Sequence, residues 1–289
     1  MIFDQYYAME EKFFCQMVDS ANLSFDAKQF DRQANITGVS QVGTSAVISI
    51  DGPIQQKLDF FMRLFGGTST DDLQSKLADA AANTQAENIV LNIQSPGGSV
   101  YGVSETASMI REVAKVKPVY AIANSYAASA AYWLGSAATK LYVTPSGEVG
   151  SIGVIMVHTD ISKMVENEGI KYTMIKSGKN KGEGNPYEPI SQDTLDFLQS
   201  RADDYYVSFV SHVATGRGVS SKDVENNFGQ GRMFGADAAL KSGLVDGIDT
   251  LSGLLARSSI GKTPYVKSRS YRANSLQLMS MNPHGFSNQ

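Results

Sequence analysis

Two segments of this 289-residue chain combine residue types suited to acyl-transfer chemistry. In AIANSYAASAAYW, Ser129 lies among alanines at a predicted strand-to-helix junction. Small neighbours leave its hydroxyl accessible there, and a helix N-terminus favours developing negative charge. In SPGG, Gly97 and Gly98 follow a predicted strand, where backbone N–H groups can form an oxyanion hole. A helix-packing serine and an ordinary tight turn are the alternative interpretations.

A nucleophilic serine needs a base, and the three histidines are poor candidates. His158, His212 and His284 lack the local context of a Ser-His-Asp arrangement, so structural or solvated roles are predicted for them. The remaining candidates are three lysines in the loop sequence IKSGKNKGEGNPY: Lys176, Lys179 and Lys181. A lysine acts as a base near neutral pH only if burial lowers its pKa from about 10.4 to roughly 7 or 8. Taken singly, each is better interpreted as a solvated loop lysine.

Composition excludes several other classes of site. The single cysteine, Cys15, cannot form an intramolecular disulfide, and one Cys with three scattered His predicts no metal site. No cofactor is predicted either. The formal net charge of −4 predicts no nucleic-acid partner. Residues 118–139 are uncharged, but their serines and alanines favour a buried strand and helix over a membrane span. Because the N-terminus also lacks a signal-peptide pattern, a cytoplasmic protein without a transmembrane segment is expected.

The elements that position these residues alternate between strand and helix. Strands are predicted at 46–52, 88–93, 118–123, 140–144, 154–158, 171–178 and 244–246. Helical patterns occur within 66–83, 103–113, 160–169 and 191–213, and twice within 236–256. The longest helix is capped by Ser191 and carries one apolar stripe from Leu195 to Val213. Strand, loop and helix repeating at this length predict parallel strands in an α/β domain.

Four motifs in order resemble peptidase family S49, which includes signal peptide peptidase A (protease IV) and tailed-phage prohead proteases. They are SPGG, YAASAAYW, GEVGSIGVIM and IKSGKNKGEGNPYEP. The resemblance implies Ser129 as nucleophile, Lys181 as general base and Ser151 as the serine whose hydroxyl holds the lysine ammonium. It also implies Gly97 and Gly98 as the oxyanion loop. The implied fold is ClpP/crotonase-like, a single α/β domain of repeated β-β-α units.

Details of the motifs are closest to the phage prohead, or capsid assembly, protease branch. Ala130 and Ala131 follow the serine, where cellular signal peptide peptidases usually have two glycines. The branch implies a serine endopeptidase that cleaves scaffold, portal or coat proteins inside the procapsid in the host cytoplasm. The resemblance further implies a homo-oligomeric ring, in which serine and lysine can come from neighbouring protomers.

The domain organisation predicted is a core with two different ends. An N-terminal arm over 1–40 is expected to pack on something, the peptidase domain spans 41–257, and 258–289 forms a basic, flexible tail. Three alternatives stay open. They are a soluble bacterial signal peptide peptidase-like S49 protease, a crotonase-like acyl-CoA enzyme using the same oxyanion geometry, and a non-catalytic capsid scaffold component.

Overall fold

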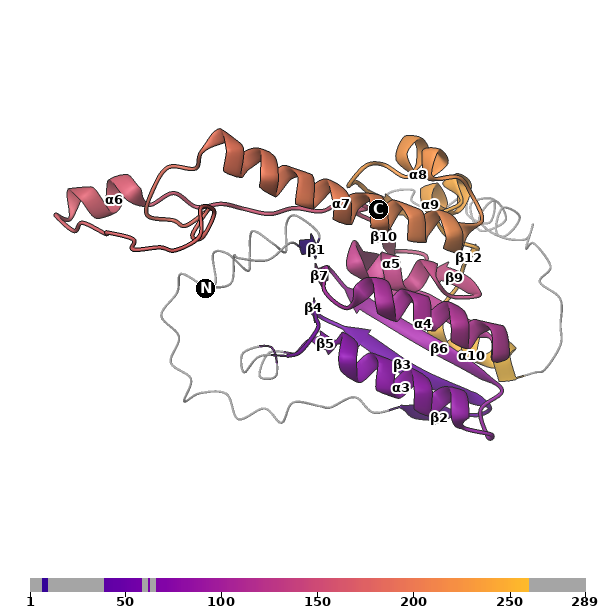
Figure 1. The fold of residues 1–289 in the computed structure, drawn as a ribbon. Helices are drawn as coiled ribbons and strands as arrows, with labels where there is room; N and C mark the ends of the chain where they lie inside the picture. Colours follow the sequence, from indigo (N-terminus) through magenta and orange to yellow (C-terminus); the bar gives the residue numbers. More distant parts are fainter. Residues whose placement is uncertain (1–6, 10–38, 59–61, 63–65, 260–289) are drawn as a thin grey trace, which may run out of the picture. The chain divides into compact units, whose positions relative to one another are not determined.

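A central, mostly parallel sheet organises the chain, seen in a computed structural model that describes residues 7–9, 39–58, 62 and 66–259 (Figure 1). Chain contacts separate Met1–Ser259 from Ile260–Gln289, and the second unit lies outside the described residues. Four strands run parallel in the centre of the sheet: β3 (Ser45–Asp51), β6 (Asn88–Ser95), β8 (Val119–Ala128) and β10 (Glu148–Gly150). Two antiparallel strands close its edges: β2 (Ser40–Val42) beside β3 and β11 (Met233–Gly235) beside β10.

β8 is long enough to pair with two successive strands on one side. Its first part pairs with β9 (Lys140–Val143), and its last three residues pair with β10. A further short strand, β12 (Gly247–Ile248), extends the sheet beyond β9. The end of β8 therefore lies between β6 and β10, and the residue after it, Ser129, emerges at the carboxyl edge of the sheet.

A second, smaller sheet lies beside this edge. Its order is β1 (Tyr7–Met9), β7 (Gly97–Ser99), β4 (Ile54–Gln55) and β5 (Thr68–Ser69). Each of two large-sheet strands is thus followed by a small-sheet strand and then by a helix, as β3–β4–α3 and β6–β7–α4, with β5 directly before α3. The predicted α/β class of repeated β-β-α units is confirmed.

Helices cover both faces of the large sheet. One face packs on α3 (Thr70–Ala82), α4 (Val103–Val116) and α5 (Ala130–Ser136), with the second half of α7 (Gln192–Arg217) packed on α5. α10 (Leu251–Ser259) covers the other face, where Leu254 packs on Val90 and Ile122. Alternate residues of β6 point to opposite faces, so Ile89, Leu91 and Ile93 join the first cluster while Val90 joins the second.

Helix boundaries follow the expected capping residues. Ser69 caps α3 by accepting a hydrogen bond from the N–H of Asp72, and Ser191 caps α7 in the same way through Thr194. Gly243 ends α9 (Ala236–Ser242) in the left-handed conformation at φ 83°. The other two helices among the described residues are α6 (Ser162–Asn167) and α8 (Ser221–Asn227). The strand and helix predicted over 118–139 are present as β8 and α5, both largely buried.

Three predicted strands are wrong. Within 154–158 only Ile155 forms an isolated bridge, with Tyr7, and 171–178 is exposed chain without a strand. A strand needs a neighbour for its backbone groups, and neither segment has a ladder partner among the described residues. The short strand expected at 244–246 lies slightly later, at Gly247–Ile248, where it pairs with β9.

Candidate active site

Ser129 occupies the junction between β8 and α5. Its side chain is fully buried in the described chain, and its N–H donates to the carbonyl oxygen of Gly150 at 2.8 Å. The Ser129 hydroxyl donates to the carbonyl oxygen of Gly153 at 3.5 Å, the long limit of a hydrogen bond. Its own carbonyl accepts the N–H of Trp133 and so starts α5. The hydroxyl is therefore held loosely while the backbone around it is held tightly.

The backbone of Ser129 is strained. Its φ of 55° and ψ of −119° are far from the regions that side-chain-bearing residues prefer. Among the described residues only four non-glycine positions have positive φ: Ser125, Ser129, Ser151 and Gln230. Two of these four are the serines that the family resemblance assigns to catalysis. Strain of this kind concentrates at functional sites, where the surrounding structure maintains it.

Packing on α7 keeps α5 in place behind Ser129. Trp133 stacks on Phe209 with ring centroids 4.5 Å apart and planes 10° from parallel. The buried hydroxyl of Tyr132 donates to the carbonyl of Leu244 at 2.9 Å, and burial raises the pKa of this phenol. Because α5 is anchored on two sides, the strained turn at its N-terminus has a rigid support.

Positions 97 and 98 each require glycine, but for different physical reasons. Gly97 has φ 90°, a conformation that side chains disfavour, and its N–H donates to the Ser95 hydroxyl at 3.2 Å. At Gly98 a Cβ atom would overlap the backbone of Ile54, because β7 and β4 approach closely there. Ser95 lies opposite Ala127 in the sheet and α5 packs against β7, so both glycines lie on the same side of the molecule as Ser129.

Ser151 follows β10, next to the nucleophile candidate. Gly150 accepts the N–H of Ser129, and the N–H of Ser151 donates to the carbonyl of Arg232 at 2.9 Å. Gly150 has φ 130°, and a Cβ atom there would meet that same Arg232 oxygen at 2.6 Å. The segment 150–153 is thus clamped between Ser129 and the chain before β11.

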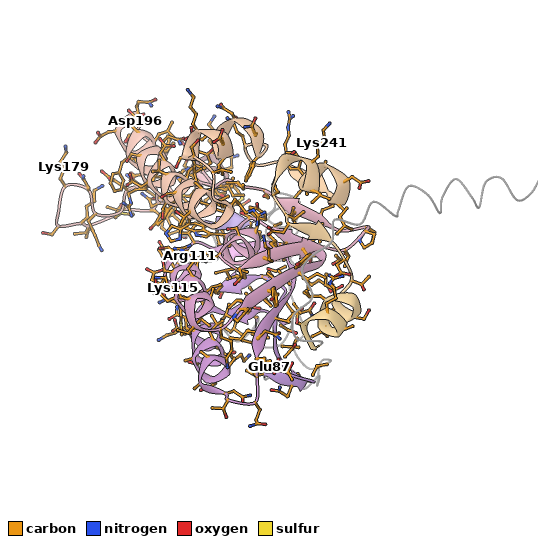
Figure 2. All side chains as sticks on the ribbon, turned by 90° about the vertical axis from the view of Figure 1, so that its right-hand side faces the viewer. Glu87, Arg111, Lys115, Lys179, Asp196 and Lys241 are labelled. Carbon is orange, nitrogen blue, oxygen red and sulfur yellow. The ribbon has the colours of Figure 1, made fainter. Side chains whose placement is uncertain are left out.

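Lys181 is not brought to these residues within one chain. It lies in an exposed turn, where its N–H donates to the carbonyl of Gly178 at 3.1 Å. We call residues 157–190, which carry α6 and this turn, the arm. Figure 1 shows α6 extending away from the sheet, and Figure 2 shows Lys179, in the same turn as Lys181, on a loop at the side of the molecule. Hydrogen bonds connect the two ends of the arm. The N–H of Ile161 donates to the carbonyl oxygen of Pro186 at 2.9 Å, and Nε2 of His158 lies 3.3 Å from the carbonyl oxygen of Asn185.

The two described histidines have structural contacts. His212 lies 3.1 Å from a guanidinium nitrogen of Arg111 and edge-on to Trp133. Burial, and then the positive charge of Arg111, lowers the pKa of His212. His158 belongs to the arm, and His284 lies outside the described residues.

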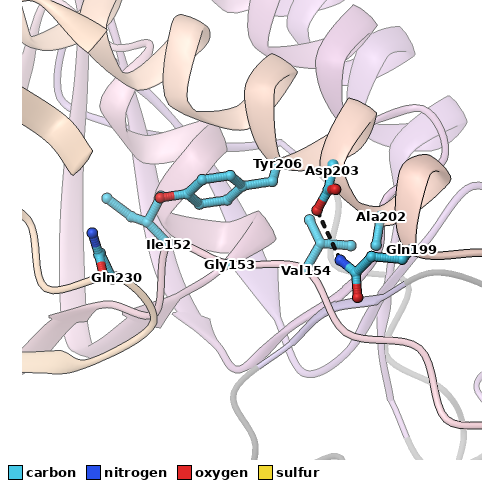
Figure 3. Close-up of a pocket in the computed structure, with 8 residues that line it drawn as sticks. All are labelled: Ile152, Gly153, Val154, Gln199, Ala202, Asp203, Tyr206 and Gln230. Atoms are coloured by element: carbon cyan, nitrogen blue, oxygen red, sulfur yellow. Dashed lines mark hydrogen bonds between the residues drawn. The ribbon is translucent and has the colours of Figure 1, made fainter. Parts of the chain in front are cut away.

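An open pocket of about 370 Å³ lies between the segment 152–154 and α7 (Figure 3). Gly153, whose carbonyl accepts the Ser129 hydroxyl, forms part of its wall, together with Tyr206 and Asp203 from α7. The amide of Gln199 donates to Asp203 at 2.8 Å on the same wall (Figure 3). The pocket therefore opens beside the nucleophile candidate.

No metal centre is found in the part of the chain that the structure describes: three or more His, Cys, Asp or Glu side chains do not gather there. The same residues include no helix long and apolar enough to cross a membrane. The expectation that no cofactor is required stays a prediction.

One part of the site was missed from the sequence. β1 pairs with the glycine strand β7 and also bridges to Ile155, so it lies across the predicted site. Of the N-terminal segment over 1–40, which is expected to pack on something, the structure describes only 7–9, 39 and 40. No sequence pattern identified Tyr7–Met9 as a strand or β7 as its partner.

A strained serine after a parallel strand, beside a glycine strand, is the site that the fold supports, and the chain belongs to peptidase family S49. The family profile matches residues 111–263, more than half of the chain. Capsid assembly protease C of Escherichia phage lambda is 32% identical over 201 residues, which cover 70% of this chain and 45% of that protein. Head-tail preconnector protein GP5 of Enterobacteria phage P21 is also 32% identical over 201 residues, covering 70% of this chain and 40% of that protein.

The chain thus spans less than half the length of these two phage relatives. Among solved structures, a mutant of ClpP1 from Listeria monocytogenes matches with a TM-score of 0.47 and 15% identity, over 72% of this chain and 94% of that chain.

Proposed function

We propose that this chain is a serine endopeptidase in which Ser129 is the nucleophile and Lys181 is the general base. The observation that carries the proposal is Ser129 itself, which is buried and strained at the carboxyl edge of the sheet, beside Gly97, Gly98 and Ser151. Membership of family S49 supports the same class of reaction.

In the proposed reaction, the neutral amine of Lys181 takes the proton of the Ser129 hydroxyl as Oγ attacks a peptide carbonyl carbon. Backbone N–H groups of the Gly97–Gly98 loop stabilise the resulting oxyanion. The C–N bond then breaks, the Lys181 ammonium gives its proton to the leaving amine, and water hydrolyses the acyl-enzyme. The Ser151 hydroxyl accepts a hydrogen bond from the ammonium and so orients it.

We place Lys181 in the site of a neighbouring copy of the chain. The arm and the first turns of α7 expose large apolar side chains: Val157, Met164, Ile170, Tyr172, Met174, Ile175, Leu195 and Phe197. Ile175 is 97% exposed. Such a surface is unfavourable in water and typical of an interface. Covering the arm with another copy would also desolvate the Lys181 amine, the condition under which a lysine serves as a base.

The proposed substrates are scaffold, portal or coat proteins of a phage head, cleaved inside a procapsid by a ring of these chains. The support is the 32% identity to a protein named as a capsid assembly protease. Expression together with coat and scaffold proteins tests it. The Ser129→Ala variant is expected to leave the coat and scaffold proteins uncleaved. Unchanged cleavage by this variant would refute the proposed peptidase activity.

Mixing two inactive variants tests the division of the site between copies. Ser129→Ala and Lys181→Ala should each lower cleavage of fluorescein-labelled casein at least a thousandfold, on the order of the loss when a catalytic group is removed. Mixed rings should recover roughly a quarter of the wild-type rate, because a Lys181→Ala copy supplies the serine and a Ser129→Ala neighbour supplies the lysine.

The matched controls are Lys179→Ala, in the same turn, and Ser136→Ala, at the far end of α5, both of which should keep full activity. No recovery on mixing, with both single variants inactive, would mean that serine and lysine act within one chain. Activity in the Lys181→Ala variant alone would eliminate this lysine as the base.

A further inference from the structure

The strand β1 lies between β7 and Ile155 of its own chain, and we call this position between the two segments the groove. On one side Tyr7, Ala8 and Met9 are opposite Ser99, Gly98 and Gly97 of β7 in an antiparallel pairing. On the other side the N–H of Tyr7 donates to Ile155 O, and the N–H of Ile155 donates to Tyr7 O, both at 2.9 Å. The backbone of β1 is therefore paired along its whole length with β7 and is bound from the opposite edge at Tyr7.

This groove runs past the proposed catalytic residues. Its first edge is the strand that contains Gly97 and Gly98. Its second edge, at Ile155, is two residues from Gly153, whose carbonyl accepts the Ser129 hydroxyl. Because Ala8 is opposite Gly98, the backbone of β1 lies where a peptide would have to lie to reach the oxyanion loop.

Two side chains of β1, those of Tyr7 and Met9, are buried. Tyr7 is 3% exposed and Met9 is 5% exposed. Residues two apart on a strand point to the same face, so two neighbouring subsites each take one large apolar side chain. Addition of an extended peptide to a sheet edge gains affinity from backbone hydrogen bonds and selectivity from alternate side chains. β1 satisfies both requirements.

We propose that Tyr7–Met9 is an internal competitor that occupies the peptide groove of the resting chain and must leave before a substrate binds. The groove selects peptides with large apolar residues at alternate positions, as in Tyr-Ala-Met. This rests on the proposed function only in taking the groove as the substrate site. Because the competitor is tethered, it acts at an effective concentration that free peptides must overcome.

Peptide binding tests the proposal without catalysis. The probe is a fluorescein-labelled peptide QYYAMEEK, the sequence of residues 5–12, and the protein is full-length Ser129→Ala. Adding Tyr7→Asp and Met9→Asp should expel the strand and lower the Kd for the probe about tenfold or more, because a larger fraction of the chains is then competent to bind. Fluorescence anisotropy measures the Kd.

The matched control adds the same two charges at exposed positions, Val39→Asp with Val42→Asp, and should leave the Kd unchanged. The proposal is overturned if the Tyr7→Asp, Met9→Asp chain and the control chain bind the probe with equal affinity. It is also overturned if the Tyr7→Asp, Met9→Asp chain does not bind the probe. The Tyr7→Asp, Met9→Asp chain could bind the probe tightly while the same chain with Ser129 restored cleaves no peptide. That result would support the role of β1 as a competitor and would refute the proposed peptidase activity.

A reversible lock gives a second test that does not depend on expelling the strand. Directly opposite residues of an antiparallel pair are close enough for a disulfide, so Tyr7→Cys with Ile155→Cys, in a Cys15→Ser background, should cross-link within one chain. The oxidised protein should lose probe binding and regain it on reduction. Oxidised protein that binds the probe as well as the reduced protein, or cross-links only between chains, contradicts the proposal.

Discussion

The residues around Ser129 and the arm that carries Lys181 differ in almost every physical respect. In β6, β8 and α5 most side chains are buried, and each strand is paired on both sides. From residue 157 to residue 193 no residue is buried. The main contacts described within the arm are its own hydrogen bonds and the stacking of Tyr172 on Tyr187, with centroids 4.0 Å apart.

This difference suggests that the two halves of the proposed dyad serve different purposes. A strained nucleophile needs a rigid support, because only surrounding structure can hold an unfavourable backbone. The proposed base, Lys181, lies on an exposed apolar arm, so its position depends on the partner that packs on the arm. Activity would then depend on assembly, and a single chain would stay inactive in solution.

The largest difference in unfolding free energy should appear between two glycines. Gly98→Ala inserts a Cβ atom into the backbone of Ile54 and should destabilise the chain by about 3 kcal/mol or more. Gly169→Ala in the arm meets no atom within 4 Å and should cost only about 1 kcal/mol, from its positive φ. Urea unfolding compares the two. Equal costs would mean that β7 is as free to adjust as the arm.

The second largest difference in unfolding free energy should appear between substitutions of two aspartates, Asp246 and Asp204. Asp246 accepts from Arg217 at 2.7 Å, from Lys140 at 2.9 Å and from the Leu141 N–H at 2.9 Å. Asp204 forms one exposed ion pair, with Arg201 at 3.0 Å. Asp246→Asn should cost about 2 kcal/mol, whereas Asp204→Asn should cost about 0.5 kcal/mol or less. Chemical denaturation at pH 7 measures both.

The pH dependence of this effect has a definite sign. Burial alone raises the pKa of Asp246, but the hydrogen bonds from Arg217 and Leu141 outweigh it, so the folded pKa lies below the ordinary value. The contribution of Asp246 is therefore complete above the unfolded pKa of about 3.9 and is lost as pH falls through the folded value. The difference between wild type and Asp246→Asn should shrink below pH 4. A difference that stays constant there would show that the carboxylate charge is irrelevant.

A smaller effect tests the strain at Ser129. Ser129→Gly should be more stable than Ser129→Ala by about 1 kcal/mol, because glycine accepts the positive φ. At Ser75, in the middle of α3, the order should reverse by a similar amount, since alanine favours a helix. Thermal unfolding of the four variants measures both differences. The same order at both sites would argue against strain at the junction.

Charges on the exposed apolar surface of the arm and the first turns of α7 should give the smallest change in stability and yet abolish assembly. Ile175→Asp with Phe197→Asp should alter the unfolding free energy by about 0.5 kcal/mol or less, because both side chains are exposed. Sedimentation should show loss of the oligomer, with casein cleavage lost in parallel. Val116→Asp, at a residue 79% exposed on α4, is the matched control and should assemble normally. Normal assembly of the Ile175→Asp, Phe197→Asp variant would exclude this surface of the arm and α7 from the interface.

The apolar periodicity of the chain predicts most of the central helices and strands. It fails where a segment forms a strand only if another segment pairs with it. β3, β6, α3 and α4 follow local patterns and caps, so their positions are close to those expected. The segments 154–158 and 171–178 have the composition of strands but lack ladder partners. The apolar stripe of α7 is continuous in sequence, yet Phe209 and Val213 are buried while Leu195 is exposed.

The chain's local patterns predict the class of chemistry, because Ser129, Ser151, Gly97, Gly98 and Lys181 lie in motifs that resemble family S49 and the few histidines are poorly placed. Which of these residues lie close together depends on how distant segments pair in the fold. Sheet register brings the glycines and both serines to one edge, whereas Lys181 stays on an arm whose apolar side chains face water. It also placed Tyr7–Met9 in the groove beside them. Such proximity depends on backbone pairing between distant segments, which local residue patterns do not encode.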